Sequence, residues 1–173
     1  MLININNKIN ISLCGMMGSG KSAIGKILAN KLDYNFIDVD KMIEIDAKKT
    51  IKKIFEEDGE EYFRDLEEKI TINFLRHKKT IVSLGGGAII NKKIRNSIKK
   101  NSYNIYLNVD LDILIKRLKN SKTRPLIYKK NLKKELINLI SIREKFYRNA
   151  DLIIQNEKNI IETIEKKKKK IIN

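Results

Sequence analysis

The sequence has little of what usually cross-links a chain or anchors it in a bilayer. It contains one cysteine, one proline, one histidine and no tryptophan in 173 residues. A single cysteine excludes a disulfide within the chain, and no apolar run approaches the roughly 18 residues of a membrane-spanning helix. No signal-like segment is evident either. We therefore expect a soluble, cytoplasmic protein that folds as one domain over residues 1–173, with Cys14 buried as a small apolar side chain.

Acidic residues are scarce relative to basic ones. The chain carries 37 lysines and arginines against 21 aspartates and glutamates, which gives a formal charge of +16. Such a charge is typical of proteins that bind nucleic acids or membrane surfaces. Here, however, lysines occur in every segment, and the one real cluster, residues 166–170, closes a predicted helix. We therefore expect no nucleic-acid and no membrane partner, and the positive field favours small anionic substrates.

Short apolar runs alternate with segments of helical periodicity along the chain. Strands are expected at residues 9–14, 35–38, 80–84, 104–108 and 152–155. Helices are expected at residues 21–32, 41–47, 51–57, 60–76, 92–99, 111–119, 132–149 and 160–169. The alternation predicts an α/β fold with a parallel sheet of about five strands and helices on both faces. A polar segment at residues 120–131 interrupts this pattern and is expected to form a mobile lid.

The most specific motif follows the first expected strand. Residues 15–22 read Gly-Met-Met-Gly-Ser-Gly-Lys-Ser, which matches the phosphate-binding pattern G-x-x-x-x-G-K-[ST] between a strand and a helix. In such a loop, backbone N–H groups surround a polyphosphate at the positive end of the helix. We expect Lys21 to reach the β- and γ-phosphates of ATP and Ser22 to bind Mg²⁺. The predicted ATP-binding residues of this loop are Gly18, Ser19, Gly20, Lys21, Ser22 and Ala23.

Parallel sheets bind ligands beyond the carboxyl ends of their strands, and further signals lie there. Asp38 and Asp40 close the second expected strand, and their spacing of two predicts that both carboxylates lie on one side of an extended segment. Residues 85–87, all glycine, follow the third expected strand and let the backbone approach a ligand closely. Arg64 lies near the start of a long expected helix. Taken singly, the aspartates can cap a helix, the glycines can form a flexible loop, and Arg64 can belong to a solvated helix face.

In this order behind the phosphate-binding loop, these segments resemble the shikimate kinase family, and the resemblance covers nearly the whole chain. Besides the loop, it rests on Phe36-Ile-Asp38-Val-Asp40, Gly59-Glu-x-x-Phe-Arg64, Ser83-Leu-Gly85-Gly86-Gly87, Arg124-Pro125-Leu126 and Arg143-x-x-x-Tyr147-x-x-Ala150. The resemblance implies a P-loop kinase that transfers the γ-phosphoryl group of ATP to the 3-hydroxyl of shikimate, with Mg²⁺ as cofactor, on the way to chorismate and aromatic amino acids. It also implies a monomer and a substrate-binding helical region near residues 40–67.

Shikimate carries one carboxylate and several hydroxyls, so its site needs cationic forks and carboxylate acceptors. We expect Arg64 and Arg143 to bind the carboxylate of the substrate. By its position in the family motif, Asp40 is expected to bind the 3-hydroxyl and to act as the general base. The substrate-binding residues are therefore predicted to be Asp40, Arg64, Gly85, Gly86, Gly87 and Arg143.

The resemblance assigns the remaining roles around the nucleotide. Arg117 is expected to stack on adenine, and Arg124 to reach the γ-phosphoryl group when the lid closes. The third expected strand lacks the terminal aspartate that many P-loop proteins use for the metal. Asp38 is therefore expected to hold Mg²⁺ through water, with Ser83 a weaker candidate for the same task. The predicted catalytic residues are Lys21, Asp40 and Arg124.

Other functions remain open at this point. A related small P-loop kinase acting on gluconate or on a nucleoside monophosphate shares the loop, the sheet and the lid. A nucleotide acceptor needs a base-binding pocket and a second phosphate site, whereas Asp40, Arg64 and Arg143 suit a hydroxylated carboxylic acid. A binding protein without catalysis is a further alternative, but the intact Lys21 argues against it. The single histidine, His77, is expected to be a solvated residue at a helix end.

Overall fold

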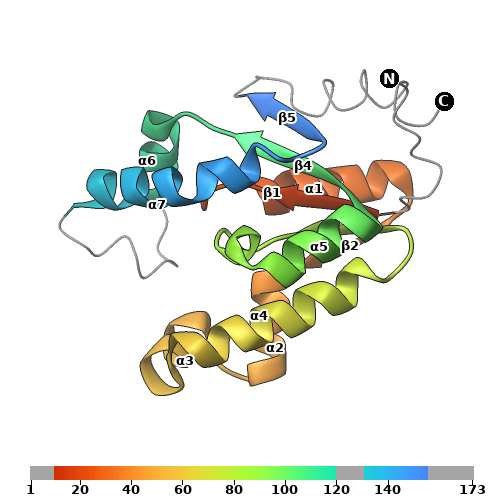
Figure 1. The fold of residues 1–173 in the computed structure, drawn as a ribbon, viewed down its shortest axis with the longest axis horizontal. Coiled ribbons are helices and arrows are strands. Elements are labelled where there is room, and N and C mark those ends of the chain that lie inside the picture. The colour runs from red at the N-terminus through yellow and green to blue at the C-terminus, as the bar shows by residue number, and fades with distance from the viewer. Residues whose placement is uncertain (1–9, 120–130, 156–173) are drawn as a thin grey trace.

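The computed structural model describes residues 10–119 and 131–155, whose arrangement is shown in Figure 1. The strands are β1 (Asn10–Cys14), β2 (Asn35–Asp38), β3 (Thr80–Ser83), β4 (Ser102–Asn108) and β5 (Leu152–Gln155). The helices are α1 (Lys21–Leu32), α2 (Val39–Ala47), α3 (Ile51–Glu57), α4 (Gly59–Leu75), α5 (Lys92–Asn101), α6 (Leu111–Lys119) and α7 (Leu132–Tyr147), with a 3₁₀ turn, η2 (Ala88–Ile90). The expected helix at 160–169 and all of the expected lid except residue 131 lie outside the described residues.

The described strands form one parallel sheet. Its five strands lie in the order β2-β3-β1-β4-β5, and every neighbouring pair is parallel. The strands β3, β1 and β4 are central and mostly buried, whereas β2 and β5 are the partly exposed edges. The predicted α/β fold with about five parallel strands is therefore confirmed. Among the described helices, none is both long and apolar enough to cross a bilayer.

Alternate residues along the strands supply two apolar cores, one on each face of the sheet. Cys14 and Val82 pack with residues of α4, α5, α6 and α7 on one face. Leu13 and Ile81 pack with α1 on the other. Cys14 is 1% exposed, and burial raises the pKa of its thiol to about 12, so it is the buried apolar residue that was predicted. In Figure 1, α2, α3 and α4 gather below the sheet, and α6 and α7 lie at its left.

The expectation for the two aspartates after β2 is wrong. Because α2 begins at Val39, Asp40 lies in the first turn of a helix and not in an extended segment. Asp38 is the N-cap, and its carboxylate accepts a hydrogen bond from the backbone N–H of Lys41 at 3.5 Å, an interaction that stabilises helix starts. Asp38 alone therefore has the extended backbone that was expected for both aspartates.

Candidate active site

The loop that follows β1 surrounds its own lysine. The Nζ atom of Lys21 donates hydrogen bonds to the carbonyl oxygens of Gly15 at 2.9 Å and Met16 at 3.0 Å, and this residue is only 9% exposed. Gly20 precedes α1 with φ of 92°, a left-handed conformation that glycine adopts without steric cost. The first turn of α1 (Lys21–Leu32) contains no acidic side chain, and no side chain caps it. Its first backbone N–H groups therefore have no competing side-chain acceptor in this turn, and their binding of a phosphate stays a prediction.

Oxygen atoms gather next to this loop at the carboxyl end of the sheet. The Oγ atom of Ser22 donates a hydrogen bond to Oδ2 of Asp38 at 2.5 Å. Asp38 and Ser83 are register partners on β2 and β3. Hydroxyl and carboxylate oxygens suit Mg²⁺, which commonly uses one or two protein ligands together with phosphate oxygens and water. The described residues contain no cluster of three or more His, Cys, Asp or Glu suited to a metal. The hydroxyl of Ser22 and the carboxylate of Asp38 are donor types that fit Mg²⁺.

The glycines that follow β3 form a tight turn. The N–H of Ala88 donates a hydrogen bond to the carbonyl oxygen of Gly85 at 3.1 Å, which closes a β-turn over residues 85–88. A methyl group on Gly85 would lie 2.5 Å from Oε1 of Glu67 and 2.9 Å from Oδ1 of Asp40. Two carboxylates from α4 and α2 thus lie against the start of the turn.

Two guanidinium groups lie against the centre of the same turn. A methyl group on Gly86 would lie 3.4 Å from Nη1 of Arg143, which belongs to α7. One on Gly87 would lie 2.7 Å from Nη1 of Arg64, which belongs to α4. The structure therefore brings together predicted residues from three helices around a turn in which Gly85 and Gly87 have no room for a side chain.

Arg143 is the cation of this site that most needs an anionic partner. It is 7% exposed. Its Nε and Nη1 atoms are buried and have no hydrogen-bond partner within residues 10–119 and 131–155. A buried charged donor without an acceptor is costly, and native proteins usually provide one. A carboxylate bound beside Gly86 would provide it.

Arg64 differs from Arg143 because it already has two partners. Its Nη1 donates to Oε2 of Glu67 at 2.7 Å, and its Nε and Nη2 donate to Oε1 of Glu60 at 3.2 and 3.1 Å. Burial lowers the pKa of the Arg64 guanidinium, but the two glutamates outweigh this effect and raise the pKa overall. Arg64 is therefore a partly exposed, oriented cation whose direction is fixed by acidic neighbours.

Glu67 is a site residue that the motifs did not reveal. Its side chain is 3% exposed. Burial raises the pKa of its carboxyl group and Asp40 adds to the rise, although Arg64 and Arg143 oppose it. A signal for it exists in the sequence, because Glu67 falls in the helical series of buried positions 63, 66, 67 and 70. A carboxylate within an apolar stripe indicates a buried charge that a neighbouring cation must balance.

The phosphate-binding loop and the glycine turn are in contact. A methyl group on Gly86 would lie 3.5 Å from the backbone nitrogen of Met17 and 3.8 Å from the carbonyl oxygen of Gly15. The same oxygen of Gly15 accepts the hydrogen bond from Lys21. The lysine of the loop and the charged groups around the turn therefore border one shared space.

The remaining predicted residues have different outcomes. The Nη1 atom of Arg117, on α6, donates to the carbonyl oxygen of Gly18 at 3.1 Å, so this arginine lies at the phosphate-binding loop, and its stacking on adenine stays a prediction. Arg124 lies outside the described residues, and its role stays a prediction. Ala23 is exposed in the first turn of α1. His77 is exposed just after α4, as predicted.

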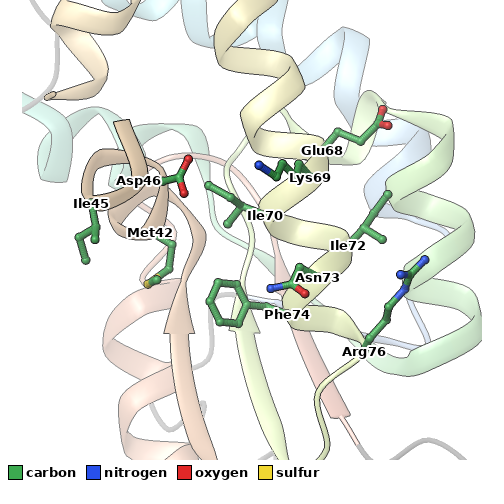
Figure 2. A pocket seen from close by; sticks show the side chains of 10 residues that line it. All are labelled: Met42, Ile45, Asp46, Glu68, Lys69, Ile70, Ile72, Asn73, Phe74 and Arg76. Carbon is green, nitrogen blue, oxygen red and sulfur yellow. The ribbon is translucent and has the colours of Figure 1, made fainter. Parts of the chain in front are cut away.

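A cavity of about 500 Å³ lies away from these residues, between α2 and the second half of α4. In Figure 2, Met42 and Ile45 on α2 lie across from Ile70 and Phe74 on α4. Its described lining contains none of the predicted site residues. The cavity is therefore separate from the candidate active site.

A phosphate-binding loop that joins a strand and a helix of a parallel sheet, with charged groups from three helices beside it, is typical of small P-loop kinases. Similarity to known proteins narrows this class. The family model for shikimate kinase matches residues 17–172. A shikimate kinase from Persephonella marina is 45% identical over 148 residues, which cover 86% of this chain and 89% of that protein. The chain therefore belongs to the shikimate kinase family.

Solved structures agree with this assignment. A shikimate kinase from Acinetobacter baumannii, solved in complex with shikimate, is 32% identical with a TM-score of 0.87, and the match covers 95% of this chain and 93% of that one. A gluconokinase from Sinorhizobium meliloti is 14% identical with a TM-score of 0.58, and the match covers 95% of this chain and 93% of that one. This second likeness shows a shared fold alone.

Proposed function

We propose that this protein transfers the γ-phosphoryl group of ATP to the 3-hydroxyl of shikimate, giving shikimate 3-phosphate and ADP. Family membership supports the choice of acceptor, as does the shikimate complex of the Acinetobacter relative. The observation that carries the proposal is Arg143, whose two buried nitrogens lack partners among the described residues. The carboxylate of shikimate supplies the acceptors that this guanidinium needs.

The acceptor half of the reaction uses the groups around the glycine turn. Arg143 binds the substrate carboxylate, and Arg64, held in place by Glu67, adds a second cation. Asp40 takes the proton of the 3-hydroxyl as the oxygen attacks the γ-phosphorus and the bond to the β,γ-bridging oxygen breaks. Asp40 suits this role because its Oδ1 would lie 2.9 Å from a methyl group on Gly85, so its carboxylate faces the turn.

The nucleotide half uses the phosphate-binding loop. Lys21 and the N–H groups at the start of α1 stabilise the charge on the transferred group. Ser22 and Asp38 would hold Mg²⁺, which neutralises charge on the β- and γ-phosphates when it is bound. Asp38 thus has two tasks, because it also caps α2 and so fixes the helix that carries Asp40.

Two further arginines belong to the nucleotide half of the proposal. Arg117 binds the nucleotide near the loop, where it already contacts Gly18. Arg124 reaches the γ-phosphoryl group from the lid at residues 120–131, an assignment that rests on the family motif alone.

Release of ADP from MgATP in the presence of shikimate, gluconate or AMP tests the proposed acceptor. We expect turnover with shikimate and background release with the other two acceptors. ADP release by the Lys21→Ala variant measures the background that does not come from the proposed site. Turnover with AMP or gluconate but not with shikimate would show that the acceptor site has been misassigned.

A further inference from the structure

The glycine turn at residues 85–88 could adopt two forms. Gly87, its second central residue, has φ of −94° and ψ of −16°, which are the values of a type I turn. A type II turn keeps the same hydrogen bond from Ala88 to Gly85 but rotates the central peptide by roughly half a turn and needs φ above zero at the second central position. Glycine occupies both central positions, so neither form is excluded by a side chain. Contacts made by groups outside the turn can therefore favour one form over the other.

Tyr147 contacts the central peptide directly. Its Oη donates a hydrogen bond to the carbonyl oxygen of Gly86 at 2.5 Å and lies 3.9 Å from the sulfur of Met16 in the phosphate-binding loop. Tyr147 is 1% exposed, and its ring is stacked on Tyr106 with centroids 4.9 Å apart. Burial raises the pKa of its hydroxyl well above the ordinary value, although Arg143 nearby opposes the rise, so this group stays protonated and donates.

The orientation of this peptide matters for the charges around it. In a trans peptide, the carbonyl of Gly86 and the N–H of Gly87 point in opposite directions, and the described residues contain no cis bond. A rotation to the type II form would exchange the positions of this acceptor and this donor. The carbonyl and the N–H that exchange positions lie between two arginines, because Arg143 lies against Gly86 and Arg64 lies against Gly87. The same two arginines are proposed to bind the substrate carboxylate, so the rotation would change the site that the carboxylate enters.

We propose that Tyr147 is a positioning residue, whose hydroxyl holds the Gly86–Gly87 peptide in the orientation that binds the acceptor substrate. The inference rests on the proposed function, in which this turn contacts shikimate. Tyr147 lies one helical turn after Arg143 on α7, so one helix face supplies both the guanidinium and the hydroxyl that fixes the backbone beside it. Tyr147 itself does not contact the reacting atoms.

The Tyr147→Phe variant removes this hydroxyl and keeps the stacked ring. Loss of one hydrogen bond at the turn should raise the KM for shikimate by about 10-fold and leave the KM for ATP unchanged. Tyr106→Phe is the matched control, because it changes the other ring of the same pair, whose hydroxyl donates to Asn108 at 3.0 Å and not to the turn. An equal rise of both KM values in Tyr147→Phe, or an equal effect of Tyr106→Phe, would overturn the proposal.

Spectra of protein labelled with ¹⁵N-glycine report the turn itself without any substrate, and the chain has only 8 glycines. We expect the amide resonances of Gly86 and Gly87 to shift or broaden in Tyr147→Phe and to stay in place in Tyr106→Phe. The unchanged protein should show one sharp Gly87 resonance. Exchange broadening there would overturn the proposal even if Tyr147→Phe failed to fold. Failure of the unchanged protein to use shikimate would instead count against the proposed function and leave these spectra as the test of Tyr147.

Discussion

The phosphate-binding loop and the proposed acceptor site are built in different ways. The loop is one continuous run, residues 15–22, and two of its own carbonyl oxygens hold the ammonium group of Lys21. The acceptor site takes Asp40 from α2, Glu67 from α4 and Arg143 from α7, and places them around the turn after β3. The loop therefore depends on its local sequence, whereas the acceptor site depends on how distant elements pack.

The two regions also handle buried charge differently. Lys21 has uncharged backbone acceptors. In the acceptor site, Glu67 responds to Arg64, Asp40 and Arg143 together, so the state of one group depends on the others. Substitutions in the loop should therefore act on one step, and substitutions around the turn should also affect their neighbours.

The largest effect is expected in the loop. Lys21→Ala should lower kcat by about 10⁴-fold, within the range that a single cation contributes to phosphoryl transfer. The affinity for shikimate, measured by calorimetry, should stay within twofold, because the acceptor site does not use this lysine. Lys26→Ala, on the exposed side of the same helix, is the matched control and should retain full activity. Near-normal turnover in Lys21→Ala would remove the lysine from the mechanism.

A smaller loss of rate is expected at Asp40, the proposed general base. Asp40→Asn should reduce kcat by about 10³-fold, as loss of a general base typically does. ATP affinity should be unchanged, because Asp40 belongs to the acceptor site. Asp46→Asn, at the far end of α2, controls for loss of a helix charge and should be active. If Asp40→Asn lost ATP affinity as well, the two regions would not be as independent as their construction indicates.

The two arginines of the acceptor site should differ from each other. Arg143→Lys should raise the KM for shikimate by roughly 10- to 100-fold, because a charged hydrogen bond from a buried group is lost. Arg64→Lys should have a smaller effect, since Arg64 already donates three hydrogen bonds to two glutamates. Arg148→Lys, exposed at the end of α7, is the control. A larger effect of Arg64→Lys would reverse the assignment of the principal carboxylate-binding group.

The smallest effect concerns stability and its dependence on pH. The pKa of Glu67 is raised in the folded protein, so its stabilising contribution is complete below the ordinary glutamate value of 4.5 and is lost as the pH rises through the raised value. A glutamine side chain cannot ionise, so the Glu67→Gln variant does not lose this stability as the pH rises. The Tm of the variant relative to the unchanged protein should therefore increase with pH across this window and then level off.

The neighbouring glutamate provides a control with the opposite sign. Hydrogen bonds from Lys93 and Asn91 lower the pKa of Glu68, so its contribution is present above the ordinary value and is lost as the pH falls. Glu68→Gln should therefore lose stability relative to the unchanged protein as the pH rises. The same pH dependence in both variants would show that burial does not distinguish the two sites.

Much of the site could be predicted because its motifs are local. The phosphate-binding loop needs a fixed spacing of Gly15, Lys21 and Ser22 between a strand and a helix, and all of these are adjacent in sequence. Asp40 was found, but its conformation was predicted wrongly, since an aspartate pair with a spacing of two fits both a strand end and a helix start. The N-cap bond of Asp38 decides in favour of the helix.

The sequence alone determined the order of strands and helices, the apolar runs that form the central strands, and the loop that faces the phosphates, because each depends on residues that are near neighbours along the chain. Tertiary structure decided which charged groups meet. The described elements η2, α5, β4 and α6 separate Gly86 from Arg143 along the chain. The pair of Arg64 and Glu67 is local to α4, but the position of α4 against the turn places both side chains beside Gly85 and Gly87. Electrostatic energies depend on distance and burial, and both are set by the packing of elements that lie far apart in the sequence.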